Sequence, residues 1–159
     1  MKRLLLYFII LIQPCSIACA QTQRLSLEQY CPVLAECNIA AYSAIRHVIF
    51  NAGSADTKKL KSFSSAFSKL VNDFESKLAE LEQVCPQESE TQIIHRLFIK
   101  QYRQINLCMK DLENDFSSGN NYALLGNIAK GKYLFRDLKD IYEIFSQSLR
   151  MIVDKEASK

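Results

Sequence analysis

The chain has 159 residues, with 20 basic and 17 acidic side chains and a formal net charge of +3. This nearly neutral balance argues against a nucleic-acid-binding protein, which would carry a clustered basic excess. Four glycines, three prolines and no tryptophan, together with long segments of helical periodicity, leave little room for a sheet and predict an all-α fold.

Residues 1–20 have the pattern of a secretory signal peptide. Lys2 and Arg3 precede an apolar run at positions 4–12, and small residues at 18–20 are suited to cleavage before Gln21. Cleavage would leave 18 basic against 17 acidic residues, a net charge of +1. We therefore expect an exported protein, periplasmic or extracellular.

Two alternatives to cleavage remain open for this segment. A membrane anchor needs about 20 apolar residues, whereas Gln13 and Pro14 interrupt the run. A bacterial lipoprotein would use Cys19, but the usual leucine of its recognition box is missing. We expect no stable membrane span after cleavage, and a single domain at residues 21–159.

The longest uninterrupted apolar periodicity runs from Asp56 to Cys85. Asp56 is a suitable N-cap, and Cys85-Pro86 is a natural stop. Large apolar residues recur there at steps of three or four, which places them on one stripe of a helix: Leu60, Phe63, Phe67, Leu70, Phe74, Leu78 and Leu81. This long amphipathic helix requires other helices to cover its stripe.

A preceding helix is predicted to start at Ser26, which forms a capping box with Gln29, and to end near Asn51. Because proline is tolerated only in the first turn, a start near Pro32 is the alternative. The expected inner face, with Asn38 as its odd member, consists of Leu27, Cys31, Leu34, Ala41, Ile45 and Val48.

A third helix is predicted to begin between Gln87 and Thr91 and to end at residues 117–120. Gly119 suits the left-handed position that follows a helix end. The expected inner face consists of Ile94, Phe98, Ile105, Cys108, Leu112 and Phe116.

A fourth helix is predicted from about Asn121, with fraying from Asp154. Gly126 and Gly131 each weaken a helix by about 1 kcal/mol relative to alanine, so a kink or a separate short helix is the alternative. The expected inner face consists of Ile128, Phe135, Leu138, Tyr142, Phe145, Leu149 and Ile152.

Four helices joined by short turns are expected to form an antiparallel, up-down four-helix bundle. The second helix is basic at its start and acidic later, an order that its own dipole disfavours. Counting back from the turn at Cys85-Pro86 sets the lysines opposite acidic residues and the glutamates opposite Arg96 and Lys100. The lysines are Lys58, Lys59 and Lys61, and the acidic residues opposite them are Asp111, Glu113 and Asp115. The glutamates opposite Arg96 and Lys100 are Glu75, Glu80 and Glu82. Solvated faces without pairing are the alternative.

Cleavage would leave four of the six cysteines: Cys31, Cys37, Cys85 and Cys108. An even number in an exported chain predicts two disulfides, and zinc is disfavoured because no Cys-x-x-Cys pair occurs. Helix levels favour Cys31–Cys85 and Cys37–Cys108, provided that the chain before Pro32 leaves the helix. The rival pairing, Cys31–Cys37 with Cys85–Cys108, would need a local loop, because six helical residues span about 9 Å.

The sequence offers little catalytic chemistry. Turn counting separates His47 and His95 by a helix length, so we expect them to share neither a metal nor a proton relay. No Ser-His-Asp or Cys-His arrangement, glycine-rich phosphate loop or Glu-x-x-His pair is found. We expect no enzymatic activity, no cofactor and no metal.

The fourth helix adds Tyr133, Leu134, Ile141 and Ile144 to its inner stripe. This apolar face is wider than one seam needs, so it predicts a surface for a partner protein. The structural alternative is a helix that touches two neighbours.

The sequence thus predicts an exported, non-enzymatic helical protein that binds a partner protein, such as an inhibitor, immunity factor, accessory subunit of an envelope machine or effector. The alternative, suggested by nine Phe and seven Tyr, is a carrier of an apolar ligand in the bundle core.

Overall fold

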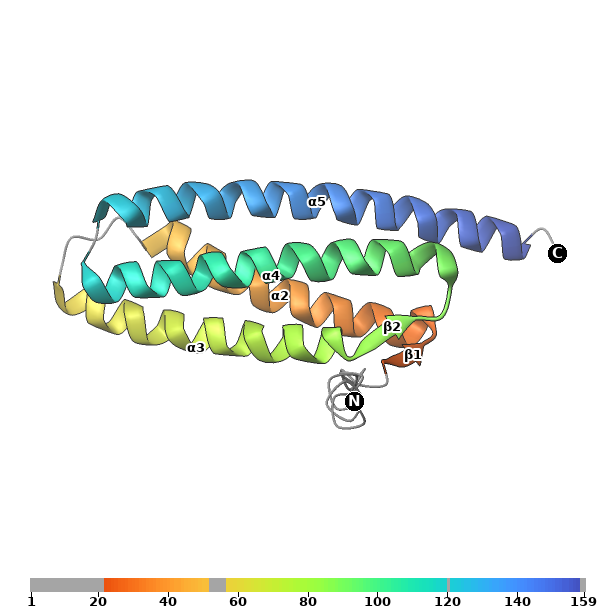
Figure 1. Ribbon diagram of the computed structural model, residues 1–159, viewed down its shortest axis with the longest axis horizontal. Helices are drawn as coiled ribbons and strands as arrows, with labels where there is room; N and C mark the ends of the chain where they lie inside the picture. The colour runs from red at the N-terminus through yellow and green to blue at the C-terminus, as the bar shows by residue number, and fades with distance from the viewer. Residues whose placement is uncertain (1–21, 52–56, 120, 158–159) are drawn as a thin grey trace, which may run out of the picture.

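The computed structural model describes residues 22–51, 57–119 and 121–157. These residues form four long helices and two short strands (Figure 1). In chain order they are β1 (Gln23–Leu25), α2 (Leu27–Asn51), α3 (Thr57–Glu82), β2 (Val84–Pro86), α4 (Ser89–Ser118) and α5 (Asn121–Ala157). The all-α class and the four helices are confirmed, and the predicted signal peptide lies outside the described residues.

The start of α2 follows the predicted cap. The backbone N–H of Ser26 donates to Oε1 of Gln29 at 3.3 Å, and its carbonyl accepts the N–H of Tyr30 at 2.8 Å. The alternative start near Pro32 is wrong, because the helix continues through it. Because proline has no N–H, the carbonyl of Glu28, four residues earlier, receives no helical hydrogen bond. Both residues are exposed, so water can donate to that carbonyl instead.

The ends of α4 and the course of α5 also follow from local chemistry. Gly119 has φ 71°, and its N–H donates to the carbonyl of Asp115, as predicted for a left-handed residue after the helix. The separate short helix considered at Gly126 and Gly131 is not formed, because α5 is one helix of 37 residues. Packing against α4 supports the helix where its intrinsic propensity is low.

The pairing of β1 with β2 was not predicted. The two strands run parallel, with Gln23 opposite Val84 and Leu25 opposite Pro86. Two further hydrogen bonds frame them: Gln23 N–H to Gln83 O and Gln87 N–H to Leu25 O, each 2.9 Å. Strands of three residues are too short to give a periodic signal.

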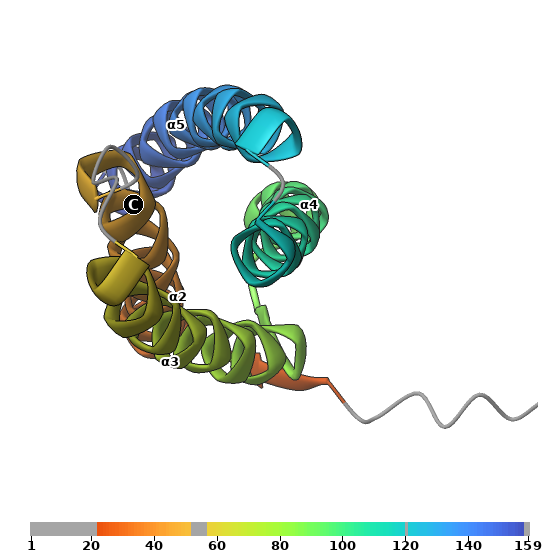
Figure 2. The ribbon, with the colours of Figure 1, turned by 90° about the vertical axis from the view of Figure 1, so that its left-hand side faces the viewer.

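The four helices surround a common interior (Figure 2). Seen end-on, α4 lies between α3 and α5, and α2 lies beside α3. The stripe predicted on α3 is confirmed at five of its described side chains, because Phe63, Phe67, Phe74, Leu78 and Leu81 are buried, whereas Leu70 is half-buried against the core.

An aromatic cluster joins all four helices in this interior. Tyr30 of α2 meets Phe145 of α5 with ring centroids 6.2 Å apart, and Phe98 of α4 lies 5.6 Å from the same ring. Phe98 also lies 4.7 Å from Tyr142. Phe74 of α3 contacts Tyr102 at 5.9 Å. Such edge-to-face pairs stabilise a core beyond their buried area.

The inner face of α2 is confirmed at Leu34, Ala41, Ile45 and Val48, which are buried, but it is wider than predicted. Tyr30, Cys37 and Ala44 are fully buried, whereas Leu27 and Cys31 are only half-buried. Asn38, the odd member, accepts a hydrogen bond from the hydroxyl of Tyr102 at 3.4 Å, which accounts for its place beside the core.

The charge pairs between α3 and α4 differ in register from those predicted. Glu82 pairs with Arg103 at 2.7 Å and Glu75 with Lys110 at 2.6 Å, instead of either pairing with Arg96. The reason is β2, which carries the chain beyond the end of α3 before α4 turns back (Figure 1). The side chains of the lysines at 58, 59 and 61 lie outside the described ones.

The two helix glycines give a matched pair of stability predictions. A Cβ on exposed Gly126 meets nothing within 4 Å, so Gly126→Ala should stabilise the protein by about 0.5–1 kcal/mol through helix propensity. A Cβ on Gly131 would lie 2.8 Å from Cδ1 of buried Ile45. Moving that side chain within a packed core offsets the gain, so urea unfolding should show Gly131→Ala to be the less stable variant. Equal stabilisation by both would contradict this packing.

Candidate functional site

The four residues predicted as a partner surface fall on two sides of α5. Tyr133 is 60 % exposed and Ile144 is 48 % exposed. Leu134 and Ile141 are half-buried and pack against the core. The second pair is seven residues apart and flanks buried Leu138, so it belongs to the inner face.

The exposed pair belongs to a longer line of apolar side chains, which we call the α5 stripe: Tyr122, Tyr133, Ile144 and Met151. Tyr122 is 93 % exposed and Met151 is 64 % exposed. Spacings of 11, 11 and 7 residues bring each side chain back to nearly the same angle around a helix of 3.6 residues per turn. Tyr122 and Met151 were missed, although this spacing is visible in the sequence.

The surroundings of the α5 stripe are polar. The guanidinium of Arg136 lies over the ring of Tyr133, with its carbon 5.0 Å from the ring centroid. Asp137 and Asp140 are exposed between Tyr133 and Ile144. The stripe therefore consists of separate apolar anchors in a charged helix surface.

The four cysteines are free in the structure, so both predicted disulfides are corrected. Gly131 of α5 lies close to both Ile45 of α2 and Cys108 of α4: a Cβ on Gly131 would lie 2.8 Å from Ile45 and 3.8 Å from Sγ of Cys108. Cys108 and Ile45 are therefore at about the same height along the bundle. That level is eight residues beyond Cys37, or about 12 Å along α2. Disulfide geometry requires much closer backbones, so Cys37 and Cys108 cannot be joined.

The other pairings depend on the start of α2. Cys31 was expected to reach Cys85 only if the chain before Pro32 left the helix, but α2 is helical from Leu27. The rival link between Cys31 and Cys37 is excluded by the same regular helix, which holds these residues six positions apart.

The buried thiols lack nucleophilic character. Burial raises the pKa of Cys37 to about 12, with Glu80 and Glu82 contributing further. Burial likewise raises the pKa of Cys108, whose thiol donates to the carbonyl of Asn127 at 3.3 Å. Thiols that remain protonated at neutral pH are poor nucleophiles.

The two histidines lie in separate side-chain clusters. The ring of His47 stacks on Phe63 with centroids 4.6 Å apart. His95 is buried, and its Nδ1 lies 3.0 Å from the hydroxyl of Tyr30. Burial, and then the charge of Arg96, lower the pKa of His95. Within the described residues no group of three or more potential metal ligands occurs.

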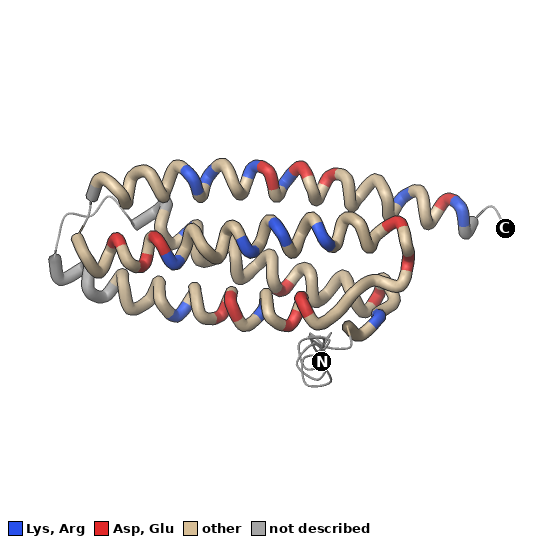
Figure 3. Tube along the Cα trace, in the orientation of Figure 1, with Lys and Arg blue, Asp and Glu red and all other residues tan. Residues whose placement is uncertain are grey.

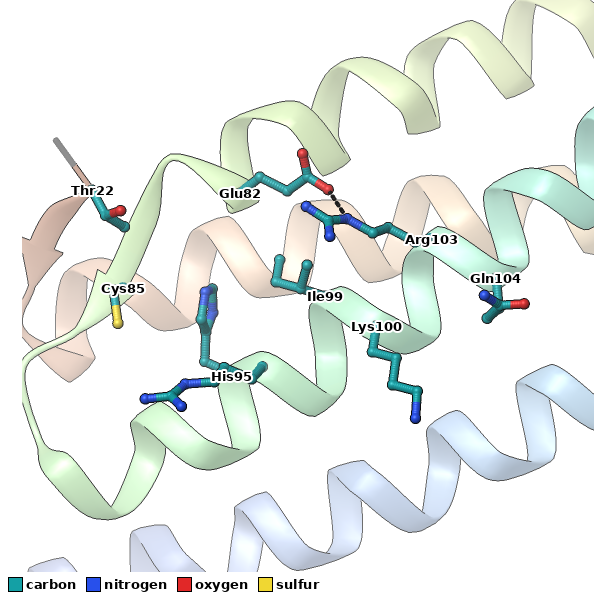
Figure 4. A pocket seen from close by; sticks show the side chains of 9 residues that line it. Thr22, Glu82, Cys85, His95, Ile99, Lys100, Arg103 and Gln104 are labelled. Carbon is teal, nitrogen blue, oxygen red and sulfur yellow. Dashed lines mark hydrogen bonds and ion pairs between the residues drawn. The ribbon is translucent and has the colours of Figure 1, made fainter. Parts of the chain in front are cut away.

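A pocket of about 570 Å³ opens between the end of α3, β2 and the first half of α4. Three cationic side chains of α4 line it, namely Arg96, Lys100 and Arg103. Figure 4 labels Lys100 and Arg103 among them. Glu82 and His95 also face it. We call it the basic pocket. The predicted pairing of Arg96 and Lys100 with glutamates of α3 had obscured it.

Comparison with known proteins gives no relative: no family model, no curated protein and no solved structure matches the chain. Among the described helices, none combines the length and the apolar character needed to cross a membrane.

The thiol assignment can be checked by peptide mapping. Alkylation of the unfolded, non-reduced protein should label Cys37 and Cys108 as free thiols, because their helix levels keep them apart. A mass-spectrometric search should find no peptide that links them. Recovery of that linked peptide would show that α2 and α4 pack in a different register.

His95 makes folding stability depend on pH. Its folded-state pKa lies below the ordinary value of 6.5, so the unfolded chain binds the proton more readily as the pH falls. Stability should therefore decline from pH 7 to pH 5. The variant His95→Asn removes the titrating ring and places an amide near the position of Nδ1. Urea unfolding of this variant should show a free energy of unfolding that depends less on pH between pH 7 and pH 5. An unchanged decline would assign it to another group.

Proposed function

We propose that this chain is an exported, non-enzymatic protein that binds a partner protein through the α5 stripe. In this proposal, residues 1–20 direct export to the periplasm or the cell exterior. Residues 21–159 then form one domain, an antiparallel up-down four-helix bundle that presents the outer side of α5. Such a protein would serve as an inhibitor, immunity factor, accessory subunit or effector.

The observation that carries the proposal is the alignment of four exposed apolar side chains on one helix. Single exposed apolar residues are normal on any surface, but Tyr122, Tyr133, Ile144 and Met151 return to one line over about 44 Å of helix. Full burial of a large apolar side chain contributes roughly 1.5–3 kcal/mol, and covering these side chains contributes in proportion to the fraction of each that is exposed. An elongated partner segment with matching apolar anchors could contact them together.

The inner side of α5 supports this use. Leu138 and Phe145 are buried against the rest of the protein, and Nε2 of Gln101 on α4 donates to the carbonyl of Leu134 at 2.7 Å. A helix held in this way offers its outer side chains without a large ordering cost, which favours affinity. Arg136 over Tyr133 is the kind of pair that dominates many interfaces.

No specific observation favours the alternative, a carrier of an apolar ligand. The aromatic rings of the interior contact one another, with Phe98 at 4.7 Å from Tyr142 and 5.6 Å from Phe145. The basic pocket is lined by charged side chains. We therefore retain protein binding as the proposed function.

Site-specific photo-crosslinking in the producing cells tests the α5 stripe. A photoreactive residue at Tyr133 or Ile144 should give a discrete adduct with the same protein. The matched control is Asp73, which is exposed on α3, and it should give none. Adducts of equal yield from all three positions, or from none, would refute the proposed surface.

A second variant separates binding from folding. Ile144→Ser should lower the crosslinking yield from Tyr133 at least tenfold, because one anchor of the shared interface is lost. Its unfolding free energy should stay within about 0.5 kcal/mol of the parent, because the side chain is exposed. An unchanged yield would mean that the two positions do not share a partner.

A further inference from the structure

The basic pocket has the size of a small-molecule site. Its volume of about 570 Å³ falls in the range of ligand pockets and far exceeds the space that a simple inorganic anion needs. Arg96, Lys100 and Arg103 follow one another at steps of four and three, which places them on one face of α4. The methyl groups of Ile99 add an apolar part to the lining (Figure 4).

The charges of the basic pocket are not balanced. Its one carboxylate, Glu82, is paired with Nε of Arg103 at 2.7 Å. Neither Arg96 nor Lys100 has a carboxylate within ion-pair distance among the described residues. Figure 3 shows the basic positions following one another along α4 without an acidic one between them. Two positive charges therefore remain uncompensated at this pocket.

This excess is local, because the whole chain has a formal charge of only +3. Cations one helical turn apart repel each other, and an anion between them would remove that repulsion. The positive field is felt within the protein as well, since Arg96 helps to lower the pKa of buried His95 beside it. The imbalance thus has a consequence for a neighbouring group that does not depend on any ligand.

We propose that the basic pocket binds a phosphate monoester, that is, an organic molecule carrying one terminal phosphate group. Such a group is close to a dianion at neutral pH, which matches the two uncompensated cations. The planar guanidinium of Arg96 can bind two phosphate oxygens at once, and the ammonium of Lys100 adds a point charge.

The rest of the pocket selects for the organic part. Ile99 offers apolar contact, and the amide of Gln104 at the rim offers hydrogen-bonding groups. Inorganic phosphate would satisfy the cations but leave this contact unused. A carboxylate of the same shape would bring one negative charge where two are needed. The proposed site is therefore independent of the α5 stripe and of the protein partner.

Titration of the purified protein with phenyl phosphate, followed by NMR or calorimetry, tests this site. We expect saturable binding, with shifts of amide signals centred on residues 96–104 and affinity that falls as salt is added. Inorganic phosphate and benzoate should each bind at least fivefold more weakly. Equal affinity for benzoate, or no saturation at 10 mM phenyl phosphate (roughly −2.7 kcal/mol of binding free energy), would overturn the proposal.

Three pocket variants and one control variant connect binding to the named residues. Arg96→Gln and Lys100→Gln should each weaken phenyl phosphate binding about tenfold, whereas the matched control Lys132→Gln, which removes an exposed charge of α5, should change it less than twofold. Glu82→Gln should strengthen binding severalfold, because it frees Arg103 from its carboxylate. Equal loss in the control and in the pocket variants would reduce the effect to net charge and refute the site.

A lipid headgroup and a soluble ester present the same phosphate, so a further arm distinguishes these sources. Sedimentation with phosphatidylcholine vesicles that contain phosphatidic acid, lost in Arg96→Gln, would assign the phosphate to a lipid. Binding of phenyl phosphate without such sedimentation would assign it to a soluble ester. Sedimentation that Arg96→Gln and Lys132→Gln reduce equally would indicate general charge attraction and count against the pocket.

Discussion

The burial of tyrosine hydroxyl groups is the constraint on which the rest of the structure depends. Tyr30 and Tyr102 are fully buried, so their hydroxyls need partners inside the protein. Tyr30 pairs with Nδ1 of His95, and Tyr102 pairs with the hydroxyl of Tyr142 at 3.0 Å. Burial raises the pKa of both, so each stays a neutral phenol. These bonds fix how α2 and α5 are rotated against α4, because purely apolar contacts would tolerate other rotations.

Both candidate sites follow from that packing. Once Leu138 and Phe145 of α5 turn inward, helix geometry places the α5 stripe on the outside. The register of α4 against α3 depends on β2, which carries the chain past α3 and lets Arg103 and Lys110 reach the glutamates. Arg96 is thereby left beside the pocket. A tight turn between α3 and α4 would have placed Arg96 opposite the glutamates of α3, and its charge would then have been neutralised.

The sequence predicts the helices well and their mutual placement less well. The stripe on α3 is unambiguous because large apolar residues alternate with polar ones. On α2, small alanines and a tyrosine with a polar end share the inner face with the predicted apolar residues, so the burial of Tyr30 and Cys37 was not predicted. The three-residue β2 gives no periodic signal, yet it shifts the register of α4 against α3 for every residue pair that is derived by counting back from the turn. The predicted Cys37–Cys108 link and the predicted ion pairs depended on that register, whereas the Cys31–Cys85 link failed because α2 is helical from Leu27. The basic pocket was missed together with the ion pairs.

The parallel pairing of β1 with β2 has a consequence for the order of assembly. It joins residues about 60 positions apart, so its loop-closure cost must be met before its few hydrogen bonds form. The contacts between α3 and α4 close shorter loops and need not wait for it. During synthesis the segment Gln23–Leu25 emerges long before its partner strand exists. The segment that contributes Thr22 to the lining of the basic pocket therefore has to wait, during synthesis, until β2 has emerged before it can pair.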